Sequence, residues 1–394
     1  MSGNIPRRTF LVVTGAAAAA GAVTVLPISA TGAPRDDLRQ RLDAALARST
    51  AKYGDLGAQA VAIRQGQPVW TAHRGKAIIT PSRPVDDNSM FAYASLSKLL
   101  VAAFALSQVE KGVIALDTPI STYLSDTVAG SRVVTPRMLL THTAGYPDVY
   151  ADPAVEPLFP PGARYDPNRP YTFEMLNAGI RQPVNPGRRF DYSNTGYHVL
   201  GQVLVKTAGG VDAFHRAFRQ FLQKAGTAQM PLTDAMITAE RSPQAFSRFV
   251  HGYTREENGS LQDFFTAYGA TGIPTDLYGL PFTDGLVAGT ATGVGMVLDA
   301  VFACDRLLRP ATVQQMVKAS PQSGSDPIFK GYGMGTYPQT VAGRTWQGHG
   351  GSYVGFNSMA GTDRSRGITV AVVVNHLTDD RAAEVIWKEL VKTV

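Results

Sequence analysis

The sequence is poor in the residues that build cross-links and metal sites. It holds a single cysteine, Cys304, among 394 residues, which excludes an intrachain disulfide and a zinc site built from cysteines. Its seven histidines include no pair at the H-x-x-x-H spacing, which places two metal ligands on one helix face. We therefore expect neither a metal nor another cofactor.

Basic clusters are also scarce. The net charge is +6, but no run of lysine and arginine with interleaved aromatic residues is present, so we expect no nucleic-acid partner. With 44% hydrophobic and 17% charged residues, the chain has the composition of a soluble globular protein with one large domain or two smaller ones.

An apolar run long enough to span a membrane is absent from the N-terminal segment. The stretch from Leu11 to Leu26 is interrupted by glycine and falls short of the roughly 20 residues that a spanning helix needs. Arg7 and Arg8 precede it and small residues follow, which is typical of a twin-arginine export signal. We expect residues 1–33 to be this signal and the protein to act outside the cytoplasm without a stable membrane anchor. A retained anchor is the alternative.

Segments typical of strands lie near both ends of the chain, and the middle is rich in helices and loops. The runs 58–64 and 68–73 flank Gln65-Gly66-Gln67, an arrangement typical of a β-hairpin. The segment 331–376 offers several short strands with glycine-rich turns, and a last helix is expected at 381–392. Both ends of the chain are thus predicted to contribute to one sheet.

We therefore expect an α+β fold with one antiparallel β-sheet, built from N- and C-terminal strands and flanked by helices. A large, mostly helical lobe is inserted between these strands. The folded domain covers residues 34–394. Its sheet lobe takes about 34–85 and 311–394, and its helical lobe takes about 86–310.

A serine and a lysine stand at the start of an apolar helix. The segment 91–117 is predicted to be a buried helix with almost no polar face, yet its first turn carries Ser95 and Lys98. Residues three apart share a helix face, so the Lys98 amine can hydrogen-bond the Ser95 hydroxyl. A neighbouring base makes a serine hydroxyl nucleophilic. A helix cap with a lysine that reaches solvent explains the tetrapeptide equally well.

A second polar group lies in the stretch "FDYSNTGYHVLGQVL". Tyr192 and Asn194 point the same way if the segment is extended. Beside the Lys98 ammonium the Tyr192 phenolate would be favoured and could act as a base. Asn194 could donate to a substrate carbonyl. A simple helix start, capped by serine or asparagine, is the alternative.

The third group lies in "WQGHGGSYVGF". His349 and Gly351 are two residues apart, and the surrounding glycines permit the close approach of another backbone or a ligand. An exposed N–H of Ser352 would suit an oxyanion hole together with that of Ser95. Taken alone, a histidine in this setting is more often structural than catalytic.

In this order, Ser-x-x-Lys, Tyr-x-Asn and His-x-Gly resemble the serine β-lactamase and penicillin-binding-protein superfamily. The resemblance is to the branch of class C β-lactamases, D-alanyl-D-alanine carboxypeptidases, D-aminopeptidases, esterases and transacylases. It covers nearly everything from about residue 55 to 394, including "VTPRMLLTHTAGY" and "NPGRRFDYSNTGYHVLGQVL". It implies a β-lactamase/transpeptidase-like α+β fold.

The resemblance also implies a role for each residue of the three motifs. Ser95 is the nucleophile of an acyl-enzyme mechanism, Lys98 keeps it ionisable, and Tyr192 moves protons to and from the leaving group. The implied substrate-binding residues are Asn194, His349 and Gly351, and the implied oxyanion hole consists of the N–H groups of Ser95 and Ser352.

The third motif departs from the best-known members. Class C β-lactamases carry Lys-Thr-Gly where this chain has His349-Gly350-Gly351. An imidazole with an ordinary pKa of about 6.5 replaces a permanent cation, so we expect weaker anchoring of anionic β-lactams near neutral pH. The resemblance then favours a hydrolase of amide bonds in D-amino-acid peptides, like the carboxypeptidases and D-aminopeptidases of this branch.

Other functions stay open. An esterase or transacylase would transfer an acyl group from a small ester or a secondary metabolite to water or an amine, and a β-lactamase is less favoured. A catalytically silent penicillin-binding protein would be expected to lose Ser95, Lys98 or Tyr192. In each case the expected partner is a small molecule or peptide that carries an ester or amide. Loops around 151–172 and 253–285 are expected to determine which one.

Two further motifs imitate the third one. Lys206-Thr207-Ala208-Gly209 resembles Lys-Thr-Gly, but we expect it to end a helix. The motif that begins at His142 precedes Tyr192 in the chain, so we expect a buried turn that supports the site. No G-x-S-x-G elbow is present, which excludes an α/β-hydrolase.

Overall fold

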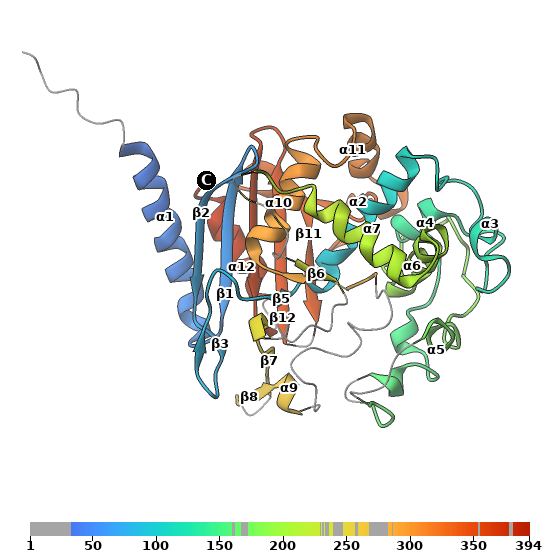
Figure 1. Cartoon of the computed structure of the whole chain (residues 1–394), viewed down its shortest axis with the longest axis horizontal. Helices are drawn as coiled ribbons and strands as arrows, with labels where there is room; N and C mark the ends of the chain where they lie inside the picture. The colour runs from blue at the N-terminus through green and yellow to red at the C-terminus, as the bar shows by residue number, and fades with distance from the viewer. Residues whose placement is uncertain are drawn as a thin grey trace, which may run out of the picture.

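Figure 1 shows the computed structural model of the chain. The expected export signal lies outside the described residues except for Ala33, and so do parts of the two loop segments expected to select the substrate. Among the described residues, none of the helices is both long and apolar enough to cross a membrane. The structure describes residues 33–159, 162–166, 172–228, 230, 232, 236–238, 247–256, 259–267, 283–285, 287–353, 355–377 and 381–394.

A six-stranded antiparallel sheet lies at the centre of the sheet lobe. Because β1 pairs with β13, the two ends of the chain meet inside the sheet, and the expected α+β fold is confirmed. In spatial order the strands are β10 (Tyr337–Val341), β11 (Arg344–Tyr353), β12 (Phe356–Asp363), β13 (Ile368–Val374), β1 (Ala58–Arg64) and β2 (Gln67–Arg74).

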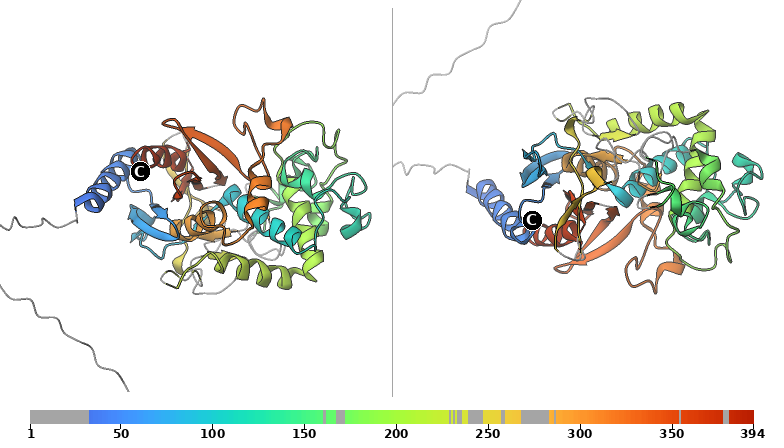
Figure 2. Two further views of the ribbon diagram at one scale, coloured as in Figure 1. Left: turned by 90° about the horizontal axis from the view of Figure 1, so that it is seen from above. Right: turned by 90° about the horizontal axis from the view of Figure 1, so that it is seen from below.

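Helices cover both faces of this sheet. As Figure 2 shows, α1 (Ala33–Thr50) and α12 (Ala382–Val391) lie side by side, and they pack on the face opposite α10 (Ala291–Phe302). The middle strands are therefore buried on both sides, which is why β13 is an apolar run broken only by Thr369. Trp387 of α12 anchors its face by donating to the Val370 carbonyl at 3.0 Å.

The position of α10 differs from the expected lobe boundary. It falls within 86–310, where we expected the helical lobe, yet it packs against β1 and β13. Gly295 permits this contact, because a Cβ at that position would lie 2.9 Å from the side chains of Val61 and Ile63. Small residues at a helix–sheet contact were not recognised in the sequence as a sign of sheet packing.

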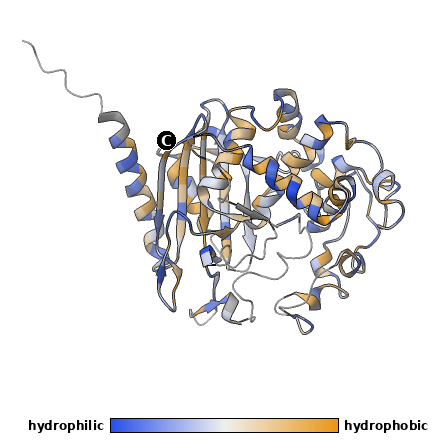
Figure 3. Cartoon of the chain, in the orientation of Figure 1, coloured by the Kyte–Doolittle hydropathy of each residue, from blue (hydrophilic) through white to orange (hydrophobic). Residues whose placement is uncertain are grey.

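The helical lobe is organised around α2 (Ser97–Glu110), which is buried from Ser97 to Ser107. Phe104 of α2 packs against a row of phenylalanines on α7 (Val211–Gln223). The row recurs at helical spacing, so α7 has an apolar face toward the lobe and polar residues elsewhere (Figure 3).

Further helices and strands belong to the described part of the molecule. The remaining helices are α3 (Ser121–Leu124), α4 (Pro136–Leu140), α5 (Phe173–Asn177), α6 (Asn194–Ala208), α9 (Phe264–Ala267) and α11 (Pro310–Val317). The remaining strands are β3 (Lys76–Ile78), β4 (Arg83–Pro84), β5 (Phe91–Ala92), β6 (Met236–Thr238), β7 (Tyr253–Arg255), β8 (Leu261–Asp263), β9 (Val287–Gly289) and β14 (His376–Leu377).

Candidate active site

Ser95 lies at a sharp turn between a strand and a helix. It belongs to the 3₁₀ turn η2 (Ala94–Leu96), which follows β5 and leads directly into α2. Ala94 has φ 51°, a left-handed conformation that costs a non-glycine residue about 1–3 kcal/mol. The expected i, i+3 contact is present although it spans two helix types, since Lys98 Nζ donates to Ser95 Oγ at 3.0 Å.

Lys98 is fully buried, so the alternative of a capped helix with a solvent-seeking lysine is wrong. Its ammonium donates to Ser95 Oγ at 3.0 Å, to Asn194 Oδ1 at 2.8 Å and to the Asp284 carbonyl at 3.0 Å. Burial lowers the pKa of Lys98 to about 8, while the charges of Asp284 and Asp148 act in the opposite direction. The amine is thus close to losing its proton near neutral pH.

Asn194 orients this lysine. It is the first residue of α6, its Oδ1 accepts from Lys98, and its Nδ2 donates to Asp148 Oδ2 at 2.9 Å. Its backbone N–H donates to the same carboxylate oxygen at 3.0 Å. The structure therefore places the Asn194 amide between the lysine and a carboxylate, and one Nδ2 hydrogen remains for a substrate. The sequence analysis missed Asp148 and Asp284.

Tyr192 lies between two rings. Its ring stacks on His142 with centroids 4.1 Å apart and on Phe329 with centroids 4.6 Å apart, and Lys98 Nζ is 5.1 Å from its ring centroid. Burial raises the pKa of Tyr192 well above its usual value, and a hydrogen bond with Ser95 offsets this only partly. The expectation that Lys98 favours the phenolate is therefore wrong for the free protein: desolvation outweighs the ammonium.

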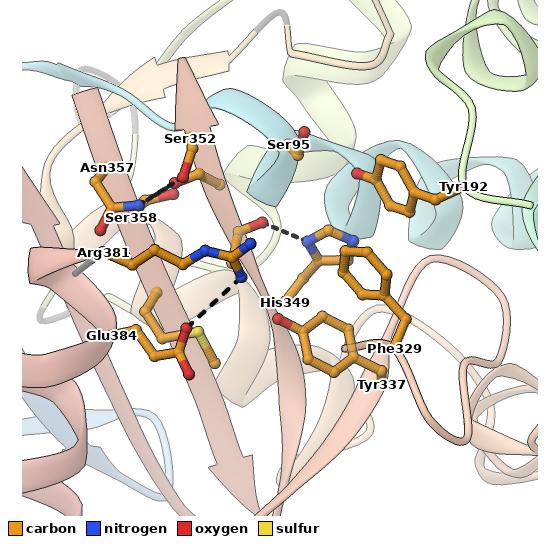
Figure 4. Close-up of a pocket in the computed structure, with 13 residues that line it drawn as sticks. Ser95, Tyr192, Phe329, Tyr337, His349, Ser352, Asn357, Ser358, Arg381 and Glu384 are labelled. Carbon is orange, nitrogen blue, oxygen red and sulfur yellow. Dashed lines mark hydrogen bonds and ion pairs between the residues drawn. The ribbon is translucent and has the colours of Figure 1, made fainter. Parts of the chain in front are cut away.

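The glycines of β11 bring the sheet against the nucleophile turn. A Cβ on Gly351 would lie 2.2 Å from the Tyr93 carbonyl oxygen and 2.9 Å from the Leu96 nitrogen, so the predicted close approach of another backbone is present. Ser352 follows Gly351 and lines the same pocket as Ser95 (Figure 4). The two residues of the predicted oxyanion hole, Ser95 and Ser352, thus line the same pocket.

His349 lines this pocket but carries no charge. Its Nε2 lies 3.0 Å from the Tyr332 hydroxyl, and its Nδ1 bonds the Gly350 carbonyl. Burial lowers the pKa of His349 to about 3, far from the ordinary value assumed from the sequence. Both ring nitrogens are occupied by partners within the protein, so His349 presents the pocket with a neutral ring.

The pocket has a volume of about 140 Å³. Its lining includes the charged residues Arg381 and Glu384, which come from the start of α12 and were missed in the sequence analysis. Arg381 Nη1 lies 4.0 Å from Glu384 Oε2, while Glu384 Oε1 is closer to Lys388 at 2.7 Å. Within the described parts of the chain, no group of three or more histidine, cysteine, aspartate or glutamate side chains is placed to hold a metal ion.

The two imitating motifs lie where the sequence predicted. Lys206 is at the end of α6, and Gly209 caps that helix with φ 90°. His142 lies in a buried turn and touches Tyr192, Tyr332 and the backbone of Ser193.

Comparison with known proteins agrees with this fold. A solved structure of D-amino acid amidase from Ochrobactrum anthropi SV3 superposes with a TM-score of 0.72 over 91% of this chain and 98% of the amidase, at 20% identity. Penicillin-binding protein 4* of Bacillus subtilis (strain 168) is 27% identical over 185 residues, 45% of this chain and 38% of that protein. Esterase EstB of Burkholderia gladioli is 34% identical over 113 residues, 27% of this chain and 29% of the esterase.

The aligned part thus spans about a third of the length of these two curated relatives. The family model described as Beta-lactamase matches residues 42–393 of the 394-residue chain. The chain therefore belongs to the beta-lactamase family.

Proposed function

We propose that the protein is a serine hydrolase that forms an acyl-enzyme on Ser95 and cleaves amide bonds of peptides that contain D-amino acids. The observation that carries the hydrolase assignment is the buried Lys98 amine, 3.0 Å from the Ser95 hydroxyl at the edge of a pocket. The substrate class draws support from the D-amino acid amidase and penicillin-binding relatives.

The partners of Lys98 determine where its lone pair points. The Asn194 Oδ1 and the Asp284 carbonyl can only accept hydrogen bonds, whereas the Ser95 hydroxyl can also donate. When Lys98 loses one proton, its two remaining hydrogens stay with the two carbonyl oxygens and its lone pair faces Ser95. The neutral amine is then placed to take the Ser95 proton.

Acylation of Ser95 proceeds through a series of proton transfers among Ser95, Lys98 and Tyr192. The Ser95 Oγ–H proton moves to Lys98 Nζ as Oγ bonds the substrate carbonyl carbon. The bond to the leaving group then breaks, and the leaving nitrogen receives the hydroxyl proton of Tyr192, which is a neutral phenol because burial raises its pKa. Lys98 returns its extra proton to Tyr192. Deacylation runs these transfers in reverse. Lys98 takes the Tyr192 proton, Tyr192 takes a proton from the water that attacks the acyl carbon, and Lys98 returns a proton to Ser95 Oγ as the acyl bond breaks.

The sheet wall holds the substrate in this scheme. The N–H groups of Ser95 and Ser352 stabilise the oxyanion. Arg381 gives the pocket a permanent positive charge at the end where Glu384 also lies, and it suits a substrate with a free carboxylate. His349 is neutral, so it does not substitute for the cation of a Lys-Thr-Gly motif at its own position in the wall.

An esterase or transacylase is the second candidate. The identity with esterase EstB favours it, and the proposed chemistry differs only in the leaving atom. We also propose that the N-terminal segment exports the protein, which would bring it to peptides outside the cytoplasm.

The test is the intact-protein mass after brief incubation with benzylpenicillin, a D-Ala-D-Ala peptide or a p-nitrophenyl ester, with Ser95→Ala as control. We expect release of D-Ala from the peptide, and a mass increase from benzylpenicillin that is absent in Ser95→Ala. Turnover of the ester alone would favour the esterase, and no Ser95-dependent change with any donor would contradict the hydrolase proposal.

A further inference from the structure

His142 holds the segment around Tyr192 in three ways. Its backbone carbonyl accepts the N–H of Asp191 at 2.8 Å, and its ring Nδ1 accepts the N–H of Ser193 at 3.2 Å. These are the residues before and after Tyr192. The imidazole also stacks on the Tyr192 ring. The position of Tyr192 is thus built around His142, a residue that the proposed mechanism does not use.

A row of hydrogen bonds leads from His142 to the sheet wall. His142 Nε2 lies 3.2 Å from the Tyr332 hydroxyl, and the same hydroxyl lies 3.0 Å from His349 Nε2. His349 Nδ1 bonds the carbonyl of Gly350. All three side chains are buried. The row therefore connects the turn that carries Tyr192 with the strand that carries the third motif.

Backbone groups at the two ends of this row fix which ring nitrogen of each neutral histidine carries the hydrogen. The N–H of Ser193 can only donate, so His142 Nδ1 accepts and the neutral ring carries its hydrogen on Nε2. That hydrogen goes to the Tyr332 oxygen, and the Tyr332 hydrogen goes to His349 Nε2. The Gly350 carbonyl can only accept, so His349 carries its hydrogen on Nδ1. The Tyr332 hydroxyl also hydrogen-bonds the Tyr197 side chain, which is a second possible acceptor for its hydrogen.

We propose that His142 and Tyr332 are positioning residues that hold Tyr192 in place and lock His349 as its neutral Nδ1–H tautomer. A proton can reach His349 Nε2 only if Tyr332 turns its hydrogen away toward the Tyr197 hydroxyl, which loses the bond from Tyr332 to His349. The inference rests on the proposed function, in which Tyr192 gives its proton to the leaving group.

Burial has the largest influence on His349 and lowers the pKa of the imidazole. The hydrogen bond to the Gly350 carbonyl raises this pKa, and the charge of Lys98 on α2 lowers it. The neutral wall leaves Lys98 as the group that titrates next to Ser95. The other titratable side chains around this row and this end of the pocket are His142, Tyr192, Tyr197, Tyr332, Tyr337, Arg381 and Glu384.

NMR of the free protein labelled with ¹⁵N-histidine tests the lock directly. The signals of His142 and His349 are identified by their loss in His142→Gln and His349→Asn. We expect hydrogen on Nε2 of His142 and on Nδ1 of His349, with no titration of either between about pH 5 and 8. A His349 hydrogen on Nε2, or a midpoint near the ordinary value of about 6.5, would overturn the proposal.

Tyr332→Phe breaks the row at its centre, and Tyr337→Phe is the matched control. Tyr337 lines the same wall and stacks on Tyr332 with ring centroids 6.0 Å apart, but its hydroxyl bonds Gln339 and the backbone of Gly350, and neither histidine ring. We expect Tyr332→Phe to raise the His349 midpoint by about one pH unit. We also expect it to lower kcat about tenfold with little change in KM, whereas Tyr337→Phe leaves the His349 tautomer unchanged. Equal His349 titration in the two variants would overturn the lock.

The lock and the proposed function fail separately. If Ser95→Ala abolishes turnover while His349 titrates like a free histidine, the hydrolase stands and the lock is wrong. If no acyl donor reacts, the tautomers of the free protein still decide the lock.

Discussion

The pocket has a helical wall and a sheet wall, and different interactions hold each of them at Ser95. On the helical wall, Ser95, Lys98 and Asn194 are joined by side-chain hydrogen bonds around one buried ammonium. On the sheet wall, Gly351 lets β11 lie against the nucleophile turn, and His349 is neutral. The helical wall supplies an amine that can gain and lose a proton, and the sheet wall supplies a fixed, uncharged surface.

This difference separates two kinds of sequence signal. The Ser-x-x-Lys motif works through residues on one helical turn, so its chemistry follows from local spacing. The His-x-Gly motif works through groups that are distant in the chain, such as Tyr332 and the backbone of Tyr93. The Ser-x-x-Lys motif predicts which side chain is reactive, and the His-x-Gly motif predicts that its strand lies close to another part of the chain.

Removing the amine of the helical wall is expected to have the largest effect. Lys98→Ala leaves the Ser95 hydroxyl without its base, and we expect kcat/KM for a p-nitrophenyl ester to fall by about 10³-fold or more. Lys206→Ala is the control, because Lys206 lies exposed at the end of α6 and should change activity by less than about twofold. A Lys98→Ala enzyme within tenfold of the wild type, about 1.4 kcal/mol in barrier, would contradict this assignment.

Separating the two walls is expected to cost stability next. Gly351→Ala would place its Cβ 2.2 Å from the Tyr93 carbonyl oxygen, so we expect the free energy of unfolding to fall by about 3 kcal/mol. A Cβ at Gly350 on the same strand would lie 3.3 Å from Met359 Sδ, so Gly350→Ala should lower the free energy of unfolding by about 1 kcal/mol or less. Equal losses in urea denaturation would show that β11 does not depend on this contact.

Changing the charge behind Lys98 should shift the pH dependence of activity. Asp148 favours the ammonium, so Asp148→Asn lowers the pKa of Lys98. The rise of kcat/KM with pH should then move to lower pH by up to about one unit. Asp126→Asn, at an exposed carboxylate paired with Arg132, should leave the profile in place. A shift to higher pH would reverse the sign that this arrangement requires.

The smallest effect is expected from the charge at the far end of the sheet wall. Arg381 is half-exposed, so Arg381→Met should raise KM by only about fivefold for a D-Ala-D-Ala peptide with a free carboxylate. The same peptide with a C-terminal carboxamide should be unaffected. Equal changes for both peptides would mean that Arg381 does not recognise the carboxylate.

Much of the sheet could be predicted from the sequence because its signals are local. The hairpin 58–73 was placed within a residue of β1 and β2, and the last helix was expected at 381–392 and runs from Ala382 to Val391. The lobe boundary was less accurate at α10. A helix that packs on a sheet and one that packs in a helical lobe have the same apolar pattern.

The candidate site was predictable in its motifs but not in its electrostatics. Asp148 is 46 residues from Asn194, and Asp284 is 186 residues from Lys98, so no spacing rule connects them. The phenolate expected at Tyr192 was wrong because burial between His142 and Phe329 depends on the tertiary fold. The charge of a side chain depends on its surroundings as much as on its type.

The pH dependence of acylation in the wild-type protein tests most directly whether Lys98 is the base for Ser95. Stopped-flow mixing with a p-nitrophenyl ester gives the acylation rate at each pH. The rate should rise with pH and level off with a midpoint at about 8, where the buried Lys98 loses its proton. A midpoint near the ordinary lysine value of about 10.4, or a rate independent of pH, would contradict that role.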